Sequence, residues 1–367
     1  MTTPPVGLAW PGNQALVTES FDPSFDLDEC LGQRQATFRF ALTDGVTGME
    51  LGDLHPIRPA SLTHDTARGI KRQLSFALTA SETAAINTLT ERVSPFMVIP
   101  GAPQEYPLGR YMFVDESRAV YTSGRLGAEA LYDEMFLVDQ EILLGISGFG
   151  RSVVDVILEA VQDLPITLGM EASPFISADA WGVGTNRGQI LETLSVAGDY
   201  WSPWFGNDGL LRFQRTFDPA LRVPDIDLDR WSRVIQASIV ETDNLLTAPN
   251  VFVVISNSAA DPDVAVVGTA SVPATAPNSV ANRGFSIPQT QDLQLSNQAQ
   301  ADAVAEGLAQ RQTVFETVTL STPPDPRHDS YNVIKWQGDL WLELAWSMTL
   351  LEGAPMTHAL RKSYGPA

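Results

Sequence analysis

The feature that most constrains the fold is a pattern of apolar residues that alternate in short clusters, with only a few helical segments between them. Residues 35–42 and 71–78 alternate large apolar and polar side chains, as half-buried strands do. Residues 251–255 form a continuous apolar run, which is the pattern of a buried strand. A regular succession of strand and helix is missing, and this disfavours a doubly wound parallel sheet. The sequence therefore predicts a β-rich α+β protein of several compact units.

Helices are predicted where a capping residue precedes apolar residues spaced three or four apart. Thr79 and Glu82 have the spacing of a capping box. Ser152 begins a second such segment, and Ser296 is the expected cap of another. The apolar face of that last helix consists of Ala301, Val304, Ala305, Leu308 and Ala309. Residues 128–144 fit either a strand or a helix, and we expect a strand near their end.

A module at residues 185–217 combines a short helix with a tight two-stranded ribbon. Asn186 has the spacing of a helix cap, and Gly198 follows where the helix would end. Asp208-Gly209 then lies between two apolar runs, which is a strong signal for a hairpin. Caps and turns account for the polar residues of the module. We therefore predict that it is scaffold, without a nucleophile–base pair or a metal site.

The charge of the chain argues against one class of function. Among its 367 residues, Lys and Arg number 23 and Asp and Glu number 44, so the formal net charge is −21. Such a surface repels phosphate, so we expect no sequence-specific nucleic-acid binding, although an acidic wall suits a channel through which DNA passes. Cys30 is the single cysteine, which excludes an intrachain disulfide and a cysteine zinc site. Without a signal peptide or a membrane-spanning run, a soluble protein made in a reducing cytosol is expected.

A glycine-rich segment at residues 144–151 has a superficial likeness to two kinds of site. It precedes a helix, but it lacks the third glycine of a dinucleotide-binding loop. Ser147 lacks the G-x-S-x-G context of a catalytic serine. We expect a plain turn into a capped helix, with neither a cofactor nor a catalytic residue.

The histidines and three alternating aspartates have side chains that can bind metals, but their spacing matches no metal-binding motif. The four histidines are His55, His64, His328 and His358. They stand singly, so a zinc site would need ligands gathered from distant strands, and we favour polar positions in loops or at strand ends. Asp225, Asp227 and Asp229 alternate, which would place three carboxylates on one side of an extended segment, where calcium could bind. The glycine and closing glutamate of an EF-hand loop are missing, so a solvated linker without a metal is preferred. Nothing singles out two of the 44 acids as a glycosidase pair.

Eight tryptophans raise the question of sugar binding. Five of them are candidates for an interface or docking role: Trp201, Trp204, Trp336, Trp341 and Trp346. Exposed aromatic rings can stack on sugars, whereas rings within apolar β-runs usually bury their area. We therefore favour core or subunit interface, and keep carbohydrate or receptor binding as the alternative.

Several segments carry a resemblance through their order along the chain. They are Phe38-Arg39-Phe40, residues 54–57, 72–78, 106–113, 152–164, the module at 185–217, residues 250–254 and 299–312, Pro326-Arg327-His328-Asp329, Trp346 and residues 353–361. In this order they resemble the tail hub proteins of tailed phages, often called minor tail proteins in phages of actinobacteria. The resemblance covers most of the chain.

The resemblance implies two tube-like β-barrel domains with a small inserted α/β domain and a C-terminal α+β portion. The first barrel corresponds to residues 1–142 and the inserted domain to 143–230. Part of the second barrel corresponds to 231–295, and 296–367 supply the helix and β segment that complete it. The edge strands expected around 34–60 and 251–255 could pair between subunits.

The resemblance also implies a homotrimeric ring at the tail tip of a siphovirus virion, assembled in the cytoplasm of the host bacterium. The ring would join the tail tube and the distal tail protein to the tip or fibre proteins. The tape measure protein would end in or near its lumen, and DNA would pass through it during ejection. Such hubs carry no catalytic residues in this region, so no enzyme activity is expected. Since the chain ends at Ala367, we expect no enzyme or host-binding domain after the core.

Overall fold

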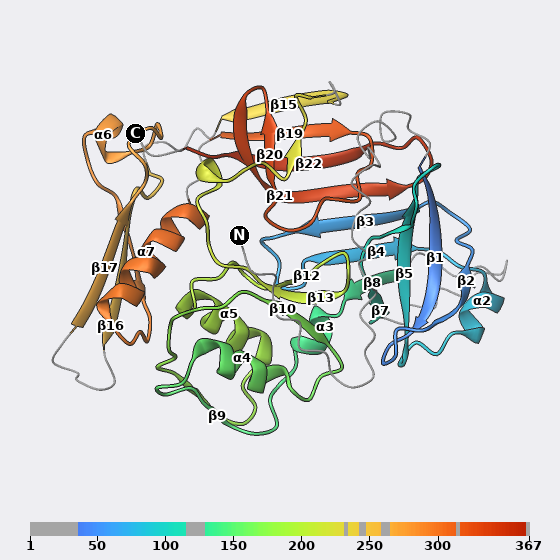
Figure 1. The fold of residues 1–367 in the computed structure, drawn as a ribbon, viewed down its shortest axis with the longest axis horizontal. Coiled ribbons are helices and arrows are strands. Elements are labelled where there is room, and N and C mark those ends of the chain that lie inside the picture. The colour runs from blue at the N-terminus through green and yellow to red at the C-terminus, as the bar shows by residue number, and fades with distance from the viewer. Residues whose placement is uncertain are drawn as a thin grey trace.

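One sheet of 14 strands dominates the computed structural model, which describes residues 36–114, 129–230, 234–241, 247–257, 265–312 and 316–364 (Figure 1). Its path is β15-β19-β22-β21-β3-β4-β8-β7-β5-β1-β2, with β6, β14 and β20 paired beside it. The strands are β1 (Thr37–Asp44), β2 (Glu50–Leu54), β3 (Ala60–Asp65), β4 (Arg72–Phe76), β5 (Glu91–Val98), β6 (Tyr106–Pro107), β7 (Tyr111–Phe113), β8 (Glu129–Asp133), β14 (Ile226–Asp227), β15 (Gln236–Glu241), β19 (Glu316–Thr322), β20 (Val333–Trp336), β21 (Asp339–Leu350) and β22 (Met356–Lys362).

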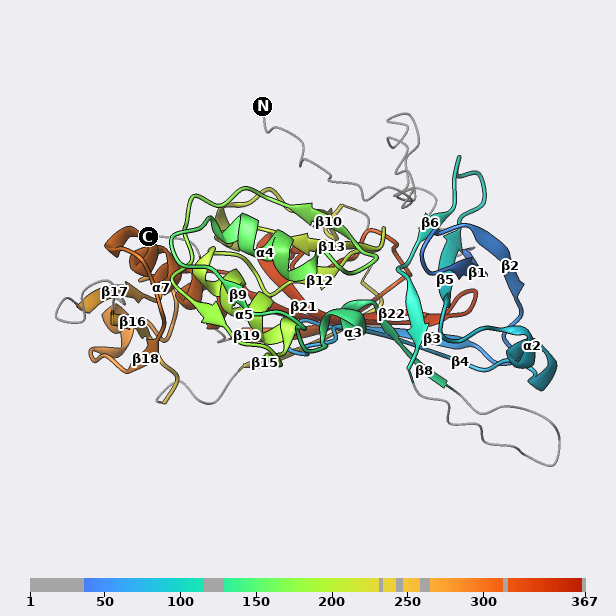
Figure 2. The ribbon, with the colours of Figure 1, turned by 90° about the horizontal axis from the view of Figure 1, so that it is seen from below.

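The sheet unites the first and last parts of the chain. Strand β21 pairs antiparallel with β3, which sets Trp346 opposite His64 and Met348 opposite Leu62. Figure 2 shows the central strands close to edge-on, with β5, β1 and β2 turning away at one end. The prediction of a β-rich α+β protein is confirmed. The two-barrel prediction is not, because the strands of the described residues form no closed barrel. The predicted domain boundaries stay predictions.

The middle of the chain forms smaller units beside the sheet (Figure 1). Strands β10-β13-β12 form one small sheet, β9 and β11 form a ribbon, and β17-β16-β18 form another small sheet. The elements are α3 (Met135–Val138), β9 (Ile146–Ser147), α4 (Val153–Val161), β10 (Thr167–Met170), β11 (Ala180–Trp181), α5 (Arg187–Ala197), β12 (Trp204–Phe205), β13 (Leu210–Phe213), the 3-10 helix η1 (Pro219–Leu221), β16 (Val251–Asn257), β17 (Ala265–Ser271), α6 (Val280–Arg283), β18 (Pro288–Asp292) and α7 (Gln298–Gln312). The remaining helix is α2 (Ala80–Ala85), beside the far end of the main sheet.

The capped helices and the hairpin form as the sequence predicts. Asn186 caps α5 by accepting a hydrogen bond from the Gln189 backbone N–H, and Gly198 ends the helix. Ser152 caps α4 through the Val154 N–H. Strands β12 and β13 pair around Gly209, whose φ of 75° favours glycine. The module at 185–217 therefore has the predicted local structure.

Three local predictions are wrong, each because a neighbour outweighs the local pattern. Strand β16, around residues 251–255, is no edge strand, because β17 and β18 pair on either side of it. The cap of α7 is Asn297 rather than Ser296, since its Oδ1 accepts from the Gln300 N–H. In the segment 128–144 the strand stands at the start, and the short helix α3 follows it.

Four buried clusters hold these units together. The largest lies among α3, α4, α5 and β10–β13, and extends to β16, β17 and the predicted apolar face of α7. A second fills the β1–β8 end of the main sheet, and a third lies under β19–β22. The fourth is small and aromatic, and it lies where the module at 185–217 meets the last strands. That meeting point positions the candidate site. No helix of the described residues is long and apolar enough to span a membrane.

Candidate functional site

The loop at residues 325–332, between β19 and β20, is the point where the three parts of the chain meet. Its Asp329 carboxylate accepts a hydrogen bond from Arg72 Nη2 on β4 at 2.5 Å and from the Trp204 indole N–H on β12 at 3.0 Å. The Arg72 side chain is fully buried, so this ion pair lies largely out of water. We call the loop and its partners on β4 and β12–β13 the junction.

The tip of the β12–β13 hairpin is inserted into the junction. Asn207 Oδ1 accepts from Arg72 Nη1 at 2.6 Å, while its Nδ2 donates to the carbonyls of Pro326 and His328 at 2.9 Å each. The Asn207 carbonyl accepts from the Gly109 N–H at 3.0 Å. One amide thus bridges the first strands, the middle module and the last loop. These hydrogen bonds fix the three parts of the chain relative to one another.

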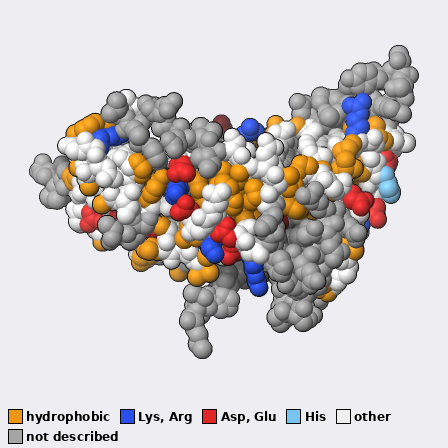
Figure 3. All heavy atoms as spheres, turned by 90° about the horizontal axis from the view of Figure 1, so that it is seen from above, with side chains coloured by type: hydrophobic (Ala, Val, Ile, Leu, Met, Phe, Trp, Pro, Cys, Tyr) orange, Lys and Arg blue, Asp and Glu red, His pale blue; other side chains and the backbone are white. Residues whose placement is uncertain are grey.

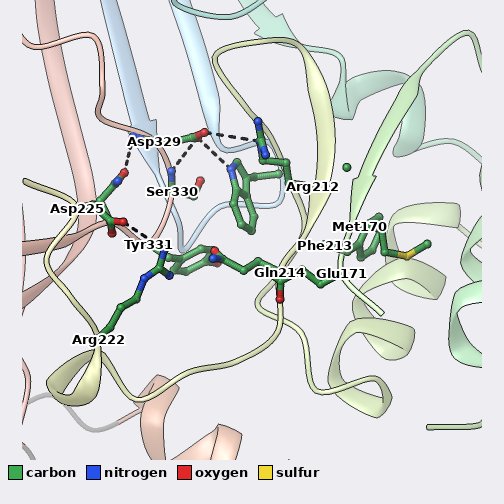
Figure 4. A pocket seen from close by; sticks show the side chains of 13 residues that line it. Met170, Glu171, Arg212, Phe213, Gln214, Arg222, Asp225, Asp329, Ser330 and Tyr331 are labelled. Carbon is green, nitrogen blue, oxygen red and sulfur yellow. Dashed lines mark hydrogen bonds and ion pairs between the residues drawn. The ribbon is translucent and has the colours of Figure 1, made fainter. Parts of the chain in front are cut away.

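A pocket of about 200 Å³ opens beside the junction (Figure 4). Among the side chains that line it are Glu171, Arg212, Arg222, Asp225, Asp329 and Tyr331. Its arginines are already paired with acids, since Arg222 contacts Asp225 at 3.2 Å and Arg212 lies 3.9 Å from Asp329. The pocket is therefore a polar seam between units.

The five candidate tryptophans lie inside the chain, at 2–6% exposure. Trp201 stacks on Tyr331 with 4.6 Å between ring centroids, and Trp204 meets the same tyrosine edge-on. Trp336 packs against Trp341 in the third cluster, and Trp346 belongs to the second. All five are core residues of the chain, and an interface role for them stays a prediction.

Ionisable groups are buried around Arg72. Burial raises the pKa of Asp133, at the end of β8, to about 7, although the Arg72 charge acts in the opposite direction. The Tyr111 pKa is raised, mainly by burial. Burial lowers the pKa of Lys71, whose ammonium donates to the Ser202 hydroxyl at 2.6 Å. The ionisable side chains around Arg72 are therefore kept from water, and other groups of the protein must compensate their charges.

Two of the scattered histidines meet one carboxylate behind the junction loop. Glu343 Oε2 lies 2.7 Å from Nδ1 of His328, and Glu343 Oε1 lies 2.7 Å from Nδ1 of His358. All three side chains are at most 1% exposed. Burial alone would lower the pKa of His328, but the Glu343 carboxylate outweighs it and raises that pKa. For His358 burial prevails, and the pKa is lowered. We call His328, Glu343 and His358 the histidine–glutamate cluster.

The expectation of loop or strand-end histidines is wrong for His358, which lies buried in the middle of β22. His64 lies near the end of β3, as expected, but it is buried, and its Nε2 pairs with the Ser330 hydroxyl at 3.0 Å. His328 is in a loop, as expected, but it is buried. His55 is exposed.

The alternating aspartates hold β20 and the turn that follows it. Asp225 accepts from the Val333 N–H at 2.8 Å, and Asp227 contacts Lys335 Nζ at 3.1 Å. Asp229 accepts from the N–H groups that follow β20. Asp225 and Asp229 are exposed, as a solvated segment predicts, but the segment pairs with β20 instead of being a free linker. The carboxylates are used by β20 and its turn.

The glycine-rich segment 144–151 forms the ribbon strand β9 and a turn into α4, as predicted. Ser147 lies exposed in that ribbon. Sequence reasoning missed Asp329, Asn207 and Glu343 as key contacts. The one available signal was Glu343, an acid within the apolar run of β21.

No protein-family model and no curated protein matches this sequence. Solved structures do match its fold. A tail protein from Neisseria meningitidis MC58 is 14% identical, with a TM-score of 0.55 over 89% of this chain and 96% of that one. The 43 kDa tail protein of prophage MuSo2 from Shewanella oneidensis is 10% identical, with a TM-score of 0.57 over 88% and 98%.

The chain has the fold of phage tail proteins. Both matches span nearly the whole of each partner, so the main sheet, the middle module and the last strands are all parts of this tail-protein fold. The resemblance seen in the sequence is thereby confirmed at the level of the fold. The junction lies where these parts meet.

Proposed function

We propose that the chain is a structural hub of a phage tail tip, and that it works through assembly rather than catalysis. The observation that carries the proposal is the tail-protein fold, which matches two tail proteins over almost their whole length. Interlocking at the junction supports it, because a load-transmitting ring needs parts that do not move independently. In the proposal, the two ends of the main sheet correspond to the two tube-like units.

We further propose a homotrimeric ring that joins the tail tube and the distal tail protein to tip or fibre proteins in a siphovirus. The tape measure protein would end at its lumen, and DNA would pass through without sequence-specific binding. The net charge of −21 supports a conduit, since an acidic wall does not retain DNA.

An open strand edge supports oligomerisation. Among the described residues, strand β15 ends the main sheet, and its Gln236, Ala237 and Ser238 are exposed in succession, so neither face of this part of the strand is covered by them. Unprotected edges of this kind invite pairing with another chain. Figure 3 looks onto the molecule from the side of β15, where hydrophobic side chains gather across the middle of the face. Strand β2 forms the opposite edge of the sheet.

Light scattering with native mass spectrometry tests the proposal. We expect three copies of the full chain, and we expect Ala237→Asp to shift the assembly towards monomer without changing the circular dichroism spectrum. Val223→Asp is the matched control, because Val223 is 81% exposed and lies in the loop between η1 and β14, outside β15. A stable monomer at micromolar concentration would contradict the proposal. The sugar-binding alternative is not advanced, since the five candidate rings are buried.

A further inference from the structure

We infer that the histidine–glutamate cluster is a binding site for a divalent transition metal of the zinc class. Three side chains that commonly ligate zinc, two imidazoles and one carboxylate, converge in the protein interior. Their donor atoms lie within 4.8 Å of one another, and the two imidazole rings lie 4.4 Å apart between centroids. The site is separate from the polar pocket of the junction.

The three ligands come from separate elements, which the fold brings together. His328 comes from the junction loop, Glu343 from β21 and His358 from β22. Strand β21 has a register shift between Glu343 and Ala345 where it pairs with β22. Such irregularities re-aim side chains, and here the carboxylate is directed between the two rings.

The hydrogen bonds of Thr322 determine which nitrogen of His358 carries a proton. The single hydroxyl hydrogen of Thr322 is donated to the Pro323 carbonyl at 2.9 Å. With that hydrogen on the Pro323 carbonyl, the hydroxyl oxygen, which lies 2.8 Å from Nε2 of His358, accepts from Nε2–H. In the neutral ring, Nδ1 is then an unprotonated lone pair.

That lone pair faces Glu343 Oε1 at 2.7 Å. Two acceptors at this distance repel one another unless a cation lies between them. A proton would fill the role only by creating a buried imidazolium or a protonated glutamate. A divalent ion takes the Nδ1 lone pairs of both rings together with the carboxylate, and it leaves Nε2–H of His358 to donate to Thr322. An outer hydrogen bond of this kind is the usual support for a metal-bound histidine.

His328 can serve as the second imidazole ligand. Its Nε2 is buried and has no hydrogen-bond partner among the described residues. If the ring were a cation bonded to Glu343, this nitrogen would be a charged N–H buried without an acceptor, which is costly. A neutral ring that binds a metal through Nδ1 reduces that cost.

The ligand set indicates the class of metal. Imidazole and carboxylate donors suit zinc and its neighbours, and three protein ligands leave one position for water or another oxygen. Zinc–ligand bonds of about 2.0–2.1 Å place tetrahedral donors roughly 3.3 Å apart. The two nitrogen–oxygen contacts of 2.7 Å would therefore widen by ~0.6 Å on binding, and donor atoms that now lie up to 4.8 Å apart would close to that spacing. The ion would tie the junction loop to β21 and β22.

The test uses the full chain, produced without a histidine tag, dialysed, and analysed by elemental mass spectrometry. We expect about one zinc ion per chain, a lower thermal midpoint after chelation, and recovery of the midpoint on adding Zn²⁺. Added Co²⁺ should give the visible absorption of a tetrahedral site. Metal content below about a tenth of an ion per chain, with no response of the midpoint to Zn²⁺ or chelator, would overturn the inference.

Variants test whether the metal binds at the histidine–glutamate cluster. Glu343→Gln keeps the shape of the side chain and should weaken metal binding at least about tenfold. The controls are His55→Asn, which removes an exposed histidine, and His64→Asn, which removes a buried one outside the cluster. Both should keep the metal, and loss of metal in either would contradict the assignment. If Glu343→Gln does not fold, the Co²⁺ spectrum and chelation of the unmodified chain still decide the question.

Discussion

Asp133→Asn isolates the effect of burying one carboxylate beside the junction. The carboxylate is fully buried at the end of β8, and its Oδ1 accepts from the Met135 N–H at 3.1 Å. Its Oδ2 has no hydrogen-bond partner among the described residues. Asparagine keeps the size of the side chain and the bonded oxygen, but it cannot ionise. The variant removes the titration, and the amide N–H groups that replace Oδ2 add a contribution that does not depend on pH.

The sign of the effect follows from proton linkage. The Asp133 pKa is raised from 3.8 to about 7, so the folded chain holds this proton more tightly than the unfolded chain. Between about pH 4 and pH 7 the folded state binds more protons, and its stability falls as the pH rises. Each pKa unit corresponds to ~1.4 kcal/mol, so the proton on Asp133 stabilises the folded chain by up to ~4 kcal/mol at low pH. This stabilisation is fully lost above about pH 7.

Urea unfolding at about pH 4 and about pH 8 measures this difference. From about pH 4 to about pH 8, the free energy of unfolding of Asp133→Asn should rise by up to ~4 kcal/mol relative to that of the unmodified chain. The contributions of the other acids are the same in both chains and cancel in this difference. A relative stability that changes by less than about 0.5 kcal/mol would refute the reasoning. Asp44→Asn is the control of opposite sign. The hydrogen bonds from Thr47 lead the causes that lower the Asp44 pKa, so its loss should destabilise more at high pH than at low pH.

Three further predictions concern packing, the junction and the alternating aspartates. Gly268→Ala should cost ~3 kcal/mol or more in urea unfolding, because its Cβ would lie 2.1 Å from the Ala301 carbonyl oxygen, whereas Gly52→Ala meets nothing within 4 Å and should change little. Trp204→Phe keeps a ring but loses the bond to Asp329, and should lower the free energy of unfolding by ~1–2 kcal/mol. Adding Ca²⁺ should leave the thermal midpoint unchanged, because the carboxylates of residues 225–229 already bind β20 and its turn, and a calcium-dependent rise would contradict this.

The parts of the fold that the sequence could predict are those decided within a few residues. The Asn186 cap, the hairpin turn at Gly209 and the apolar face of α7 depend on local hydrogen bonds and periodicity. The junction was not predictable in this way. Arg72 and Asp329 are 257 positions apart, and long-range pairing such as that of β3 with β21 brings their elements together.

The same limit applies to the aspartates and the histidines. The spacing of Asp225 and Asp227 correctly placed them on one side of an extended segment, but it could not show that β20 lies along that side. His328 and His358 looked isolated because the pairing of β21 with β22 and the path of the loop before β20, not the sequence interval, bring them to Glu343. Long-range pairing decides which polar side chains meet, and it leaves little trace in a single sequence.

The central claim is that copies of this chain assemble into a ring around a channel. Electron microscopy of the purified full chain tests it most directly, with class averages viewed along the ring axis. We predict three copies around an open centre wide enough for duplex DNA. Particles of one chain, or an oligomer without a central opening, would contradict the claim.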